Sequence, residues 1–284
     1  MQPARPSRTA LRVAMRRAAH QLYDAPPLVL DDPIAVPILG PYADEISRTP
    51  GRNPRHKPRP FSITLRAFLV ARSRYAEDQL AHAVARGITQ YVLLGAGLDT
   101  FAHRNPHPSL RVFEVDHPAT QQWKRELLLA GNLPAPANLT YAPVDFERQS
   151  LPAQLHAAGF DSAAPSFFAW LGVVPYLTLA AFRATLAFIA AQPRGTGLVF
   201  DYGQPRATLP PLEQLAHDSL ASRVHLAGEA FQLFFTPAEI AAELAAFPSR
   251  EDIGSPEINA RYFAARTDTL KVRGSAGRLV SAWL

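Results

Sequence analysis

The hydrophobic positions of this chain change their period from about residue 88 onward. Short continuous apolar runs, typical of buried strands, alternate with longer stretches in which apolar residues recur at helical spacing. This alternation predicts a mostly parallel sheet with helices on both faces, an α/β fold. The expected strands are residues 91–94, 110–115, 139–143, 166–171, 197–201 and 279–284, and the clearest helices between them are 118–130 and 179–191.

The N-terminal part has a helical pattern of its own. Apolar residues recur at spacings of four, three and four, which places them on one face of a helix. They are Leu11, Met15, Ala18 and Leu22. Ser7 precedes them at a position suited to an N-cap, so the helix is expected to begin there.

Proline-rich and polar segments suggest how the chain is divided. Residues 49–60 have the composition of an exposed loop, and a helix is expected from about residue 61 to Gly87. We therefore expect an N-terminal helical cap over residues 1–75 and a Rossmann-like domain over 76–284. Residues 204–235, rich in leucine, histidine and proline, interrupt the alternation and are expected to form an inserted helical lid.

Composition narrows the chemistry. The 284 residues include no cysteine, which excludes disulfides, thiolate metal sites and a cysteine nucleophile. The formal charge is +5, yet no basic run is interleaved with aromatic residues, so nucleic acid is not the expected partner. Arg12, Arg16 and His20 form a separate stripe on the N-terminal helix, with Arg17 turned to another side.

Targeting and membrane signals are weak. The N-terminus lacks an apolar core of the secretory type, and the most apolar stretch, residues 167–192, is interrupted by Pro175 and Arg183. We expect a cytoplasmic protein that does not span a membrane.

A glycine-rich turn follows the first strand of the expected sheet. Gly95, Ala96 and Gly97 stand where open α/β sheets bind cofactors, because glycine allows a tight turn and a close approach of the backbone to a ligand. The dinucleotide fingerprint requires a third glycine, but this position is Thr100. A cofactor without phosphates therefore fits better than a dinucleotide.

Acidic residues end the next two strands. Asp116 lies 21 residues after Gly95, where a carboxylate accepts hydrogen bonds from ribose hydroxyls, and Glu114 is a competing candidate on the same side of the strand. The third strand runs into Asp145 and Phe146, a carboxylate that can accept from an adenine amine and a ring on which adenine can stack.

Together these segments resemble the leucine carboxyl methyltransferase family, and the N-terminal motifs resemble its bacterial branch. The first set is Val92-Leu-Leu-Gly-Ala-Gly-Leu-Asp-Thr100, Phe113-Glu-Val-Asp-His-Pro118 and Phe168-Ala-Trp-Leu-Gly-Val-Val-Pro-Tyr-Leu177; the second is Ser7-Arg-Thr-Ala10, Arg17-Ala-Ala-His20 and Asp31-Asp-Pro33. The resemblance covers nearly the whole chain. It implies a class I, Rossmann-like methyltransferase fold with a seven-stranded sheet, and S-adenosylmethionine as the cofactor.

The resemblance also implies roles for particular residues. Arg72 matches the arginine that binds the methionine carboxylate of the cofactor, Gly95 the glycine-loop contact and Asp116 the ribose-binding acid. Asp145 with Phe146 matches the pair on the adenine side. Many members also carry a glutamate after the fourth strand.

This chain departs from the family pattern at that glutamate. Leu171 stands where those members have the glutamate. Without a carboxylate, this residue could contact the cofactor only through its backbone.

Methyl transfer to a carboxylate requires positioning more than acid–base chemistry. A carboxylate is ionised at neutral pH and needs no general base, whereas a hydroxyl acceptor would need one. Arg17 is a candidate clamp for a carboxylate, and Tyr176 a candidate for the acceptor side of the site. The candidate bases, none in a diagnostic spacing, are His20, His103, His117, His217 and His225.

The sequence therefore predicts an S-adenosylmethionine-dependent O-methyltransferase that acts on a carboxylate of a small molecule. No spacing of histidines or carboxylates indicates a metal site. The alternatives are an NAD(P)-dependent oxidoreductase on the same type of sheet and a non-catalytic cofactor-binding protein.

Overall fold

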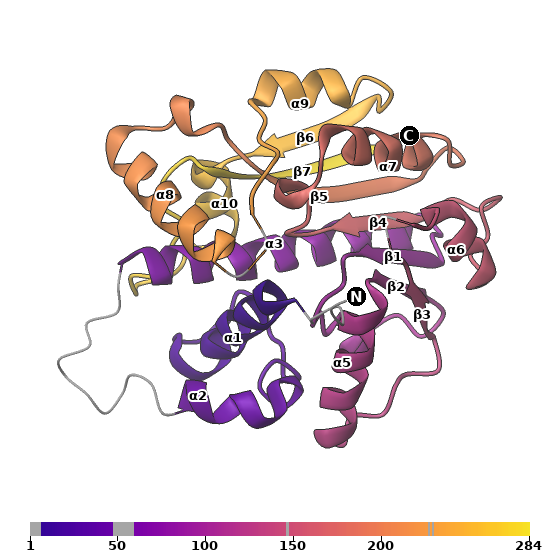
Figure 1. Cartoon of the computed structure of the whole chain (residues 1–284), viewed down its shortest axis with the longest axis horizontal. Helices are drawn as coiled ribbons and strands as arrows, with labels where there is room; N and C mark the ends of the chain where they lie inside the picture. The colour runs from indigo at the N-terminus through magenta and orange to yellow at the C-terminus, as the bar shows by residue number, and fades with distance from the viewer. Residues whose placement is uncertain (1–6, 48–59, 146–147, 227, 229) are drawn as a thin grey trace.

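Seven strands form one sheet in the order β3-β2-β1-β4-β5-β7-β6 (Figure 1). The computed structural model describes residues 7–47, 60–145, 148–226, 228 and 230–284. Only β7 runs against its neighbours, because it pairs antiparallel with both β5 and β6. The strands are β1 (Gln90–Leu94), β2 (Arg111–Asp116), β3 (Leu139–Pro143), β4 (Phe167–Trp170), β5 (Gly197–Gly203), β6 (Ser249–Ile253) and β7 (Gly277–Trp283). The predicted class I, Rossmann-like architecture is confirmed.

Helices cover both faces of this sheet (Figure 1). The α-helices are α1 (Arg8–Tyr23), α2 (Ala43–Ser47), α3 (Pro60–Ala85), α4 (Phe101–Arg104), α5 (Pro118–Ala130), α6 (Leu151–Ala157), α7 (Leu179–Ala190), α8 (Pro211–His225), α9 (Pro237–Glu243) and α10 (Ser255–Tyr262). Short 3-10 helices are η1 (Pro37–Tyr42), η2 (Val174–Tyr176) and η3 (Arg206–Thr208).

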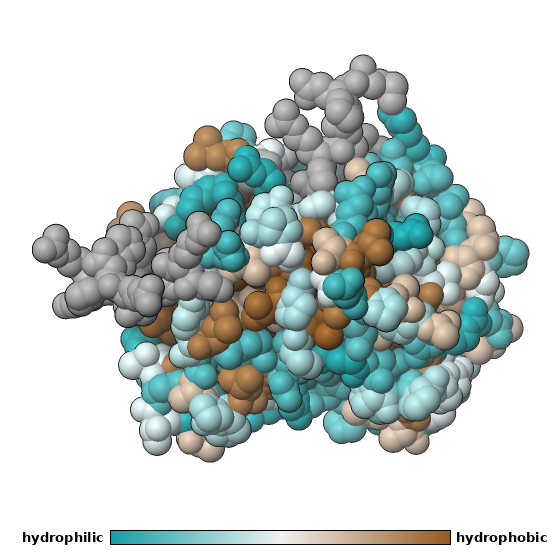
Figure 2. Space-filling view, turned by 90° about the horizontal axis from the view of Figure 1, so that it is seen from below, coloured by the Kyte–Doolittle hydropathy of each residue, from teal (hydrophilic) through white to brown (hydrophobic). Residues whose placement is uncertain are grey.

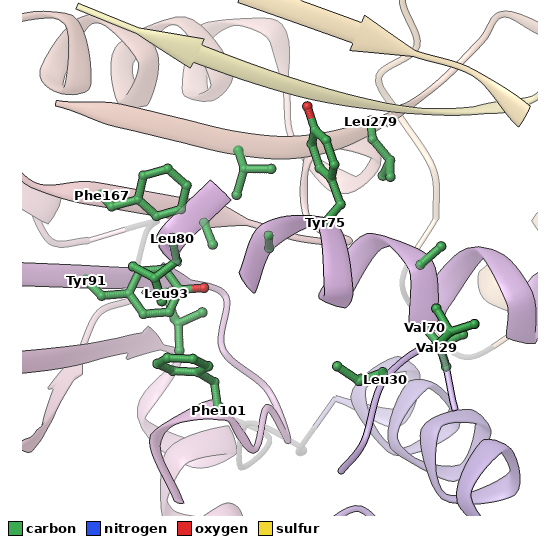
Figure 3. Packing of buried hydrophobic residues seen from close by; sticks show 14 of the residues in the cluster. Val29, Leu30, Val70, Tyr75, Leu80, Tyr91, Leu93, Phe101, Phe167 and Leu279 are labelled. Carbon is green, nitrogen blue, oxygen red and sulfur yellow. The ribbon is translucent and has the colours of Figure 1, made fainter. Parts of the chain in front are cut away.

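The alternation of side chains along β1 divides the core into two layers. Tyr91 and Leu93 join a cluster with α3, α4 and α10, whereas Val92 and Leu94 join one with α6, α7 and α9. Every residue of β1 is buried, which explains why Tyr91–Leu94 are apolar; the one polar residue, Gln90, donates to the Asp161 carbonyl at 2.9 Å. The ring of Tyr91 lies between the strands and α4, with its centroid 5.1 Å from that of Phe101 (Figure 3).

A third cluster joins the N-terminal segment to α5. Ala14 and Ala18 of α1 pack with Ile38 and Leu39 of η1 and with Leu127 of α5. These elements lie on the side that faces downward in Figure 1, and hydrophobic residues gather near the middle of that face among hydrophilic ones (Figure 2). The N-terminal segment therefore has apolar packing of its own, in addition to its contacts with the sheet.

Helix α3 connects this segment with the sheet. It runs from Pro60 to Ala85, across the boundary expected between residues 75 and 76. Its buried residues Val70 and Tyr75 belong to the same cluster as the sheet residues Phe167 and Leu279 (Figure 3). The two parts of the chain thus share one helix.

Most predicted elements are present, with two differences. Ser7 caps α1 as expected, since its hydroxyl oxygen accepts from the backbone N–H of Ala10 at 3.1 Å. Strand β6 was missed because its sequence, Ser-Arg-Glu-Asp-Ile, is largely polar. The expected lid at 204–235 is helical only in η3 and α8, and residues 230–235 have no regular structure. Within the described residues, no helix is long and apolar enough to span a bilayer.

A buried ion pair lies between β2 and α5. Lys124 Nζ is 2.6 Å from Glu114 Oε2, both side chains are fully buried, and the same ammonium donates to the Asp99 carbonyl at 2.6 Å. Burial raises the pKa of Glu114, and the adjacent Lys124 opposes this effect. Each charge is tolerated because the other neutralises it.

Replacing one member of this pair should destabilise the fold strongly. In Lys124→Met, Glu114 remains buried without a counter-charge, and the free energy of unfolding should fall by about 3–5 kcal/mol. Chemical denaturation measures this loss. The double variant Lys124→Met/Glu114→Leu should recover most of it, and equal losses in the single and double variants would contradict this account.

Candidate active site

A cavity of about 450 Å³ opens at the carboxyl ends of β1 and β4. Its wall combines the glycine loop, α1, α3, the turn after β4 and part of the segment 228–232. This is the edge at which parallel α/β sheets bind ligands, and the volume is in the usual range for a small-molecule site.

The glycine loop requires glycine for two reasons. Gly95 and Gly97 have φ angles of +69° and +50°, in the left-handed region that other residues rarely adopt. A Cβ atom on Gly95 would lie 2.3 Å from Val173 Cγ2. The backbone N–H groups of Gly95 and Ala96 both donate to the Val115 carbonyl, which fixes the loop against β2.

Asp116 lies in the cavity wall at the end of β2. Its Oδ2 accepts from the N–H of Gly97 at 2.6 Å, and its Oδ1 accepts from the N–H of His117 at 2.7 Å. Burial raises the pKa of Asp116, and these two N–H donors offset part of the increase. Since an ionised carboxylate has about four acceptor positions, Asp116 can accept further bonds from a ligand.

Arg72 reaches the cavity from α3. It is 8% exposed, and its Nη1 donates to Asp201 Oδ2 at 3.0 Å. Asp201 Oδ1 accepts from the N–H of Gly172 at 2.5 Å, and a Cβ atom on Gly172 would lie 2.7 Å from the Arg72 guanidinium. No hydrogen bond to Nε or Nη2 of Arg72 occurs among the described residues, so these donors are available for an anion.

Sequence reasoning missed Asp201 as a site residue. The available signal was its position at the end of the fifth expected strand.

Arg17 lies in the wall, but it is directed at the glycine loop. Its Nη1 is 3.4 Å from Asp99 Oδ2, and its Nη2 donates to the Leu98 carbonyl. Burial favours the neutral form of Asp99, but the charges of Arg17, Lys124 and Arg104 outweigh it and lower the pKa of Asp99. Arg17 thus attaches α1 to the loop.

Thr100, at the position of the absent third glycine, has a structural partner. Its hydroxyl donates to Asp32 Oδ2 at 2.6 Å, and both residues are fully buried. Asp32 belongs to the Asp-Asp-Pro motif of the N-terminal segment, so Thr100 joins that segment to the loop.

The remaining predicted site residues fall into three groups. Ala96, Leu171 and Tyr176 line the cavity. Asp145 is not among the lining residues, and Phe146 lies outside the described residues. Glu114, the competing ribose acid, is buried against Lys124 and is absent from the wall.

One of the five candidate histidine bases lines the cavity. This is His117, whose Nδ1 accepts from the N–H of Ala119 at 3.2 Å and so caps α5. His20 is buried away from the wall, where its Nδ1 is 2.8 Å from Asp24 Oδ2 and its Nε2 accepts from Val29. Burial lowers the pKa of His103 to about 4. The described part of the chain holds no group of three or more potential metal ligands.

Comparison with known proteins identifies the chain's relatives. The model of the leucine carboxyl methyltransferase family matches residues 10–190. The Bacillus subtilis protein YktD, whose name assigns it provisionally to the S-adenosyl-L-methionine-dependent methyltransferases, is 33% identical over 291 residues, covering 93% of both chains. A Streptomyces coelicolor protein with the same provisional assignment, SCO7813, is 38% identical over 44% of each chain.

Solved structures support the fold. A DUF574 family protein from Streptomyces avermitilis superposes with a TM-score of 0.57 at 16% identity, over 96% of both chains. A protein from Thermobifida fusca, described provisionally as a methyltransferase, also gives 0.57 at 17% identity, over 98% of this chain and 95% of its own.

Asp116 should control cofactor affinity and its dependence on pH. Asp116→Asn removes the charge that strengthens hydrogen bonds from two hydroxyls, and the Kd for S-adenosylmethionine should rise about ten- to a hundredfold. Wild-type affinity should decline as acid protonates Asp116, whose pKa is raised, whereas the variant should lack this decline.

Calorimetric titration at several pH values measures both effects. Asp161→Asn is the control, because Asp161 likewise accepts a backbone N–H, from Ala163 at 2.9 Å, but lies outside the cavity wall. An unchanged affinity in Asp116→Asn would contradict the assignment.

Gly172→Ala should displace Arg72. The new Cβ would overlap the guanidinium, so S-adenosylmethionine should bind at least about tenfold more weakly because a charged hydrogen bond is lost. Gly87→Ala is the matched control, since Gly87 has a φ of +92° but open space around it. If the two variants lose equal affinity, the overlap with Arg72 is not the cause.

Proposed function

Because this chain belongs to the leucine carboxyl methyltransferase family and is an S-adenosylmethionine-dependent methyltransferase, we propose that it methylates a carboxylate of a small molecule. The observation that carries this proposal is a wall with a second arginine, Arg17, besides Arg72, and with a histidine and an aspartate that already have partners. Nδ1 of its histidine, His117, caps α5, and Asp99 is paired with Arg17.

We propose that the cofactor lies along the glycine loop. Asp116 accepts from its ribose hydroxyls, and Arg72 donates Nε and Nη2 to its methionine carboxylate. The main chain at Gly95–Gly97 and Leu171 lies against it. The family resemblance would place Asp145 on the adenine side. When bound, S-adenosylmethionine supplies an electrophilic methyl group on a sulfonium cation.

The protein's own contribution is to position the reactants and to exclude water. Asp201 accepts from one nitrogen of Arg72 and from the N–H of Gly172, which restricts the orientation of the guanidinium before a ligand arrives. Such preorganisation removes the entropy of aligning two reactants. Helix α1 and the residues Gly228, Ala230 and Gln232 form part of the wall and thereby reduce the access of solvent.

On the acceptor side we propose Arg17 and Tyr176. Arg17 keeps a buried Nε without a hydrogen-bond partner among the described residues, and the ring of Tyr176 stands 5.2 Å from that of Phe231. A carboxylate acceptor is ionised at neutral pH, so its oxygen attacks without transferring a proton to the protein.

A panel of carboxylic acids tests this function. The enzyme should release S-adenosylhomocysteine only in the presence of a carboxylic acid, and the methyl ester of that acid should form at the same time. The value of kcat should stay level from about pH 6 to 9 because a carboxylate is ionised throughout that range. His117→Ala should retain kcat within about threefold. The proposal would be overturned if the wild-type enzyme methylated phenols or alcohols and His117→Ala abolished this activity while still binding the cofactor. Such a result would indicate base-assisted transfer.

A further inference from the structure

The arginine stripe of α1 borders the cavity. Thr9 and Val13 line the wall, and Arg12 and Arg16 follow Thr9 by three and seven residues. Residues at these spacings share one face of a helix. The two arginines therefore lie next to the wall-forming residues Thr9 and Val13 on α1, although they are not themselves among the residues that line the cavity.

Hydrogen bonds bring a third arginine into this group. Arg16 Nη1 donates to the Arg12 carbonyl at 3.0 Å, and Arg12 Nη1 donates to the carbonyl of Arg223, in the last turn of α8, at 3.2 Å. Arg16 Nε is buried and has no hydrogen-bond partner in the part of the chain that the structure describes. The group, here called the arginine cluster, consists of Arg12, Arg16 and Arg223.

No carboxylate of the described residues pairs with the arginine cluster. Arg66, whose charge acts on Arg16, is itself paired with Asp24, which accepts from it at 2.8 and 2.6 Å and lies 2.8 Å from His20 Nδ1. Its oxygens are thus committed to other partners. Burial, followed by the charges of Arg223, Arg12 and Arg66, lowers the pKa of Arg16, as expected for a cation surrounded by cations.

An oxyanion would complete this arrangement. Guanidinium groups bind carboxylates and phosphates through paired N–H donors, and like charges held together favour such a ligand. The cofactor's own carboxylate already has a partner in Arg72. A molecule that enters the cavity past Thr9 and Val13 would bring a second anionic group to the cluster.

We propose that the arginine cluster binds an oxyanion group of the acceptor, a carboxylate or a phosphate, other than the group that is methylated. The preferred acceptor is then at least dianionic. The anion site itself stands on the cluster, whereas its role in acceptor choice rests on the function proposed above.

Anion binding is tested first without turnover. Inorganic phosphate and malonate are titrated into the full chain at constant ionic strength, with the thermal midpoint and calorimetric heat as readouts. The anions should raise the thermal midpoint of the wild-type protein by several degrees, and this increase should be absent in Arg16→Gln. Arg86→Gln, which removes the same charge beside the Trp283 ring, should behave as wild type.

Arg223→Gln is a second variant that spares the helix contact, because Arg223 uses its carbonyl to accept from Arg12. The anion-induced increase in thermal midpoint should also be absent in Arg223→Gln, and this variant replaces Arg16→Gln in the test if Arg16→Gln does not fold. A response to phosphate only would identify a phosphate-bearing ligand, and a response to malonate a polycarboxylate. Equal gains in wild type and in both cluster variants would overturn the site.

Methyl transfer then tests the link to the acceptor. Arg16→Gln should raise KM at least tenfold for acids with a second carboxylate or a phosphate, with kcat and the KM of monocarboxylic acids unchanged. If Arg16→Gln changed KM by the same factor for acids with and without a second anionic group, the acceptor role would be overturned. If no acid is methylated but the anion response remains specific to the cluster, the function proposed above fails and the anion site stands.

Discussion

The attachment of the N-terminal segment to the glycine loop is the interaction on which the site depends. Arg17 bonds to the loop at Leu98 and Asp99, and Asp32 accepts from Thr100 within the same buried region. These bonds are favourable because Arg17, Asp32 and Thr100 are buried, where little water competes for the hydrogen bonds. Together with the packing of Ala14 and Ala18 against η1 and α5, they hold α1 in the wall of the cavity.

Sequence patterns predicted the sheet well and its polar edge poorly. Apolar runs identify strands that are buried on both faces, whereas β6 has three consecutive charged residues. One of them, Glu251, accepts from the hydroxyl of Tyr75. Within the site, local motifs indicated Asp116 and Gly95. They could not indicate that Arg72 would bond to Asp201, because the two residues are 129 positions apart and only the fold brings them together. Spacing likewise could not separate Glu114 from Asp116, since the difference lies in the pairing of Glu114 with Lys124.

The family match covers only part of the chain that forms the cavity. The family match ends at residue 190, and it includes the glycine loop, Asp116 and the turn after β4. Helix α8, Gly228, Ala230 and Gln232 lie beyond it. Helix α8 contributes Arg223 of the arginine cluster, and the other three residues contribute part of the cavity wall. The matched part therefore supports methyl transfer, and the segments beyond it form part of the cavity in which we propose that the acceptor binds.

The long helix α3 constrains how such proteins can be recombined. It enters the central hydrophobic layer beside Val29 and Leu30 of the preceding segment, and it also carries Arg72. A chimera joined at residue 75 would divide this helix and separate the arginine from half of its packing. Exchange of the N-terminal segment between relatives is compatible with this architecture only when the junction precedes Pro60, so that the helix is inherited with the sheet it supports.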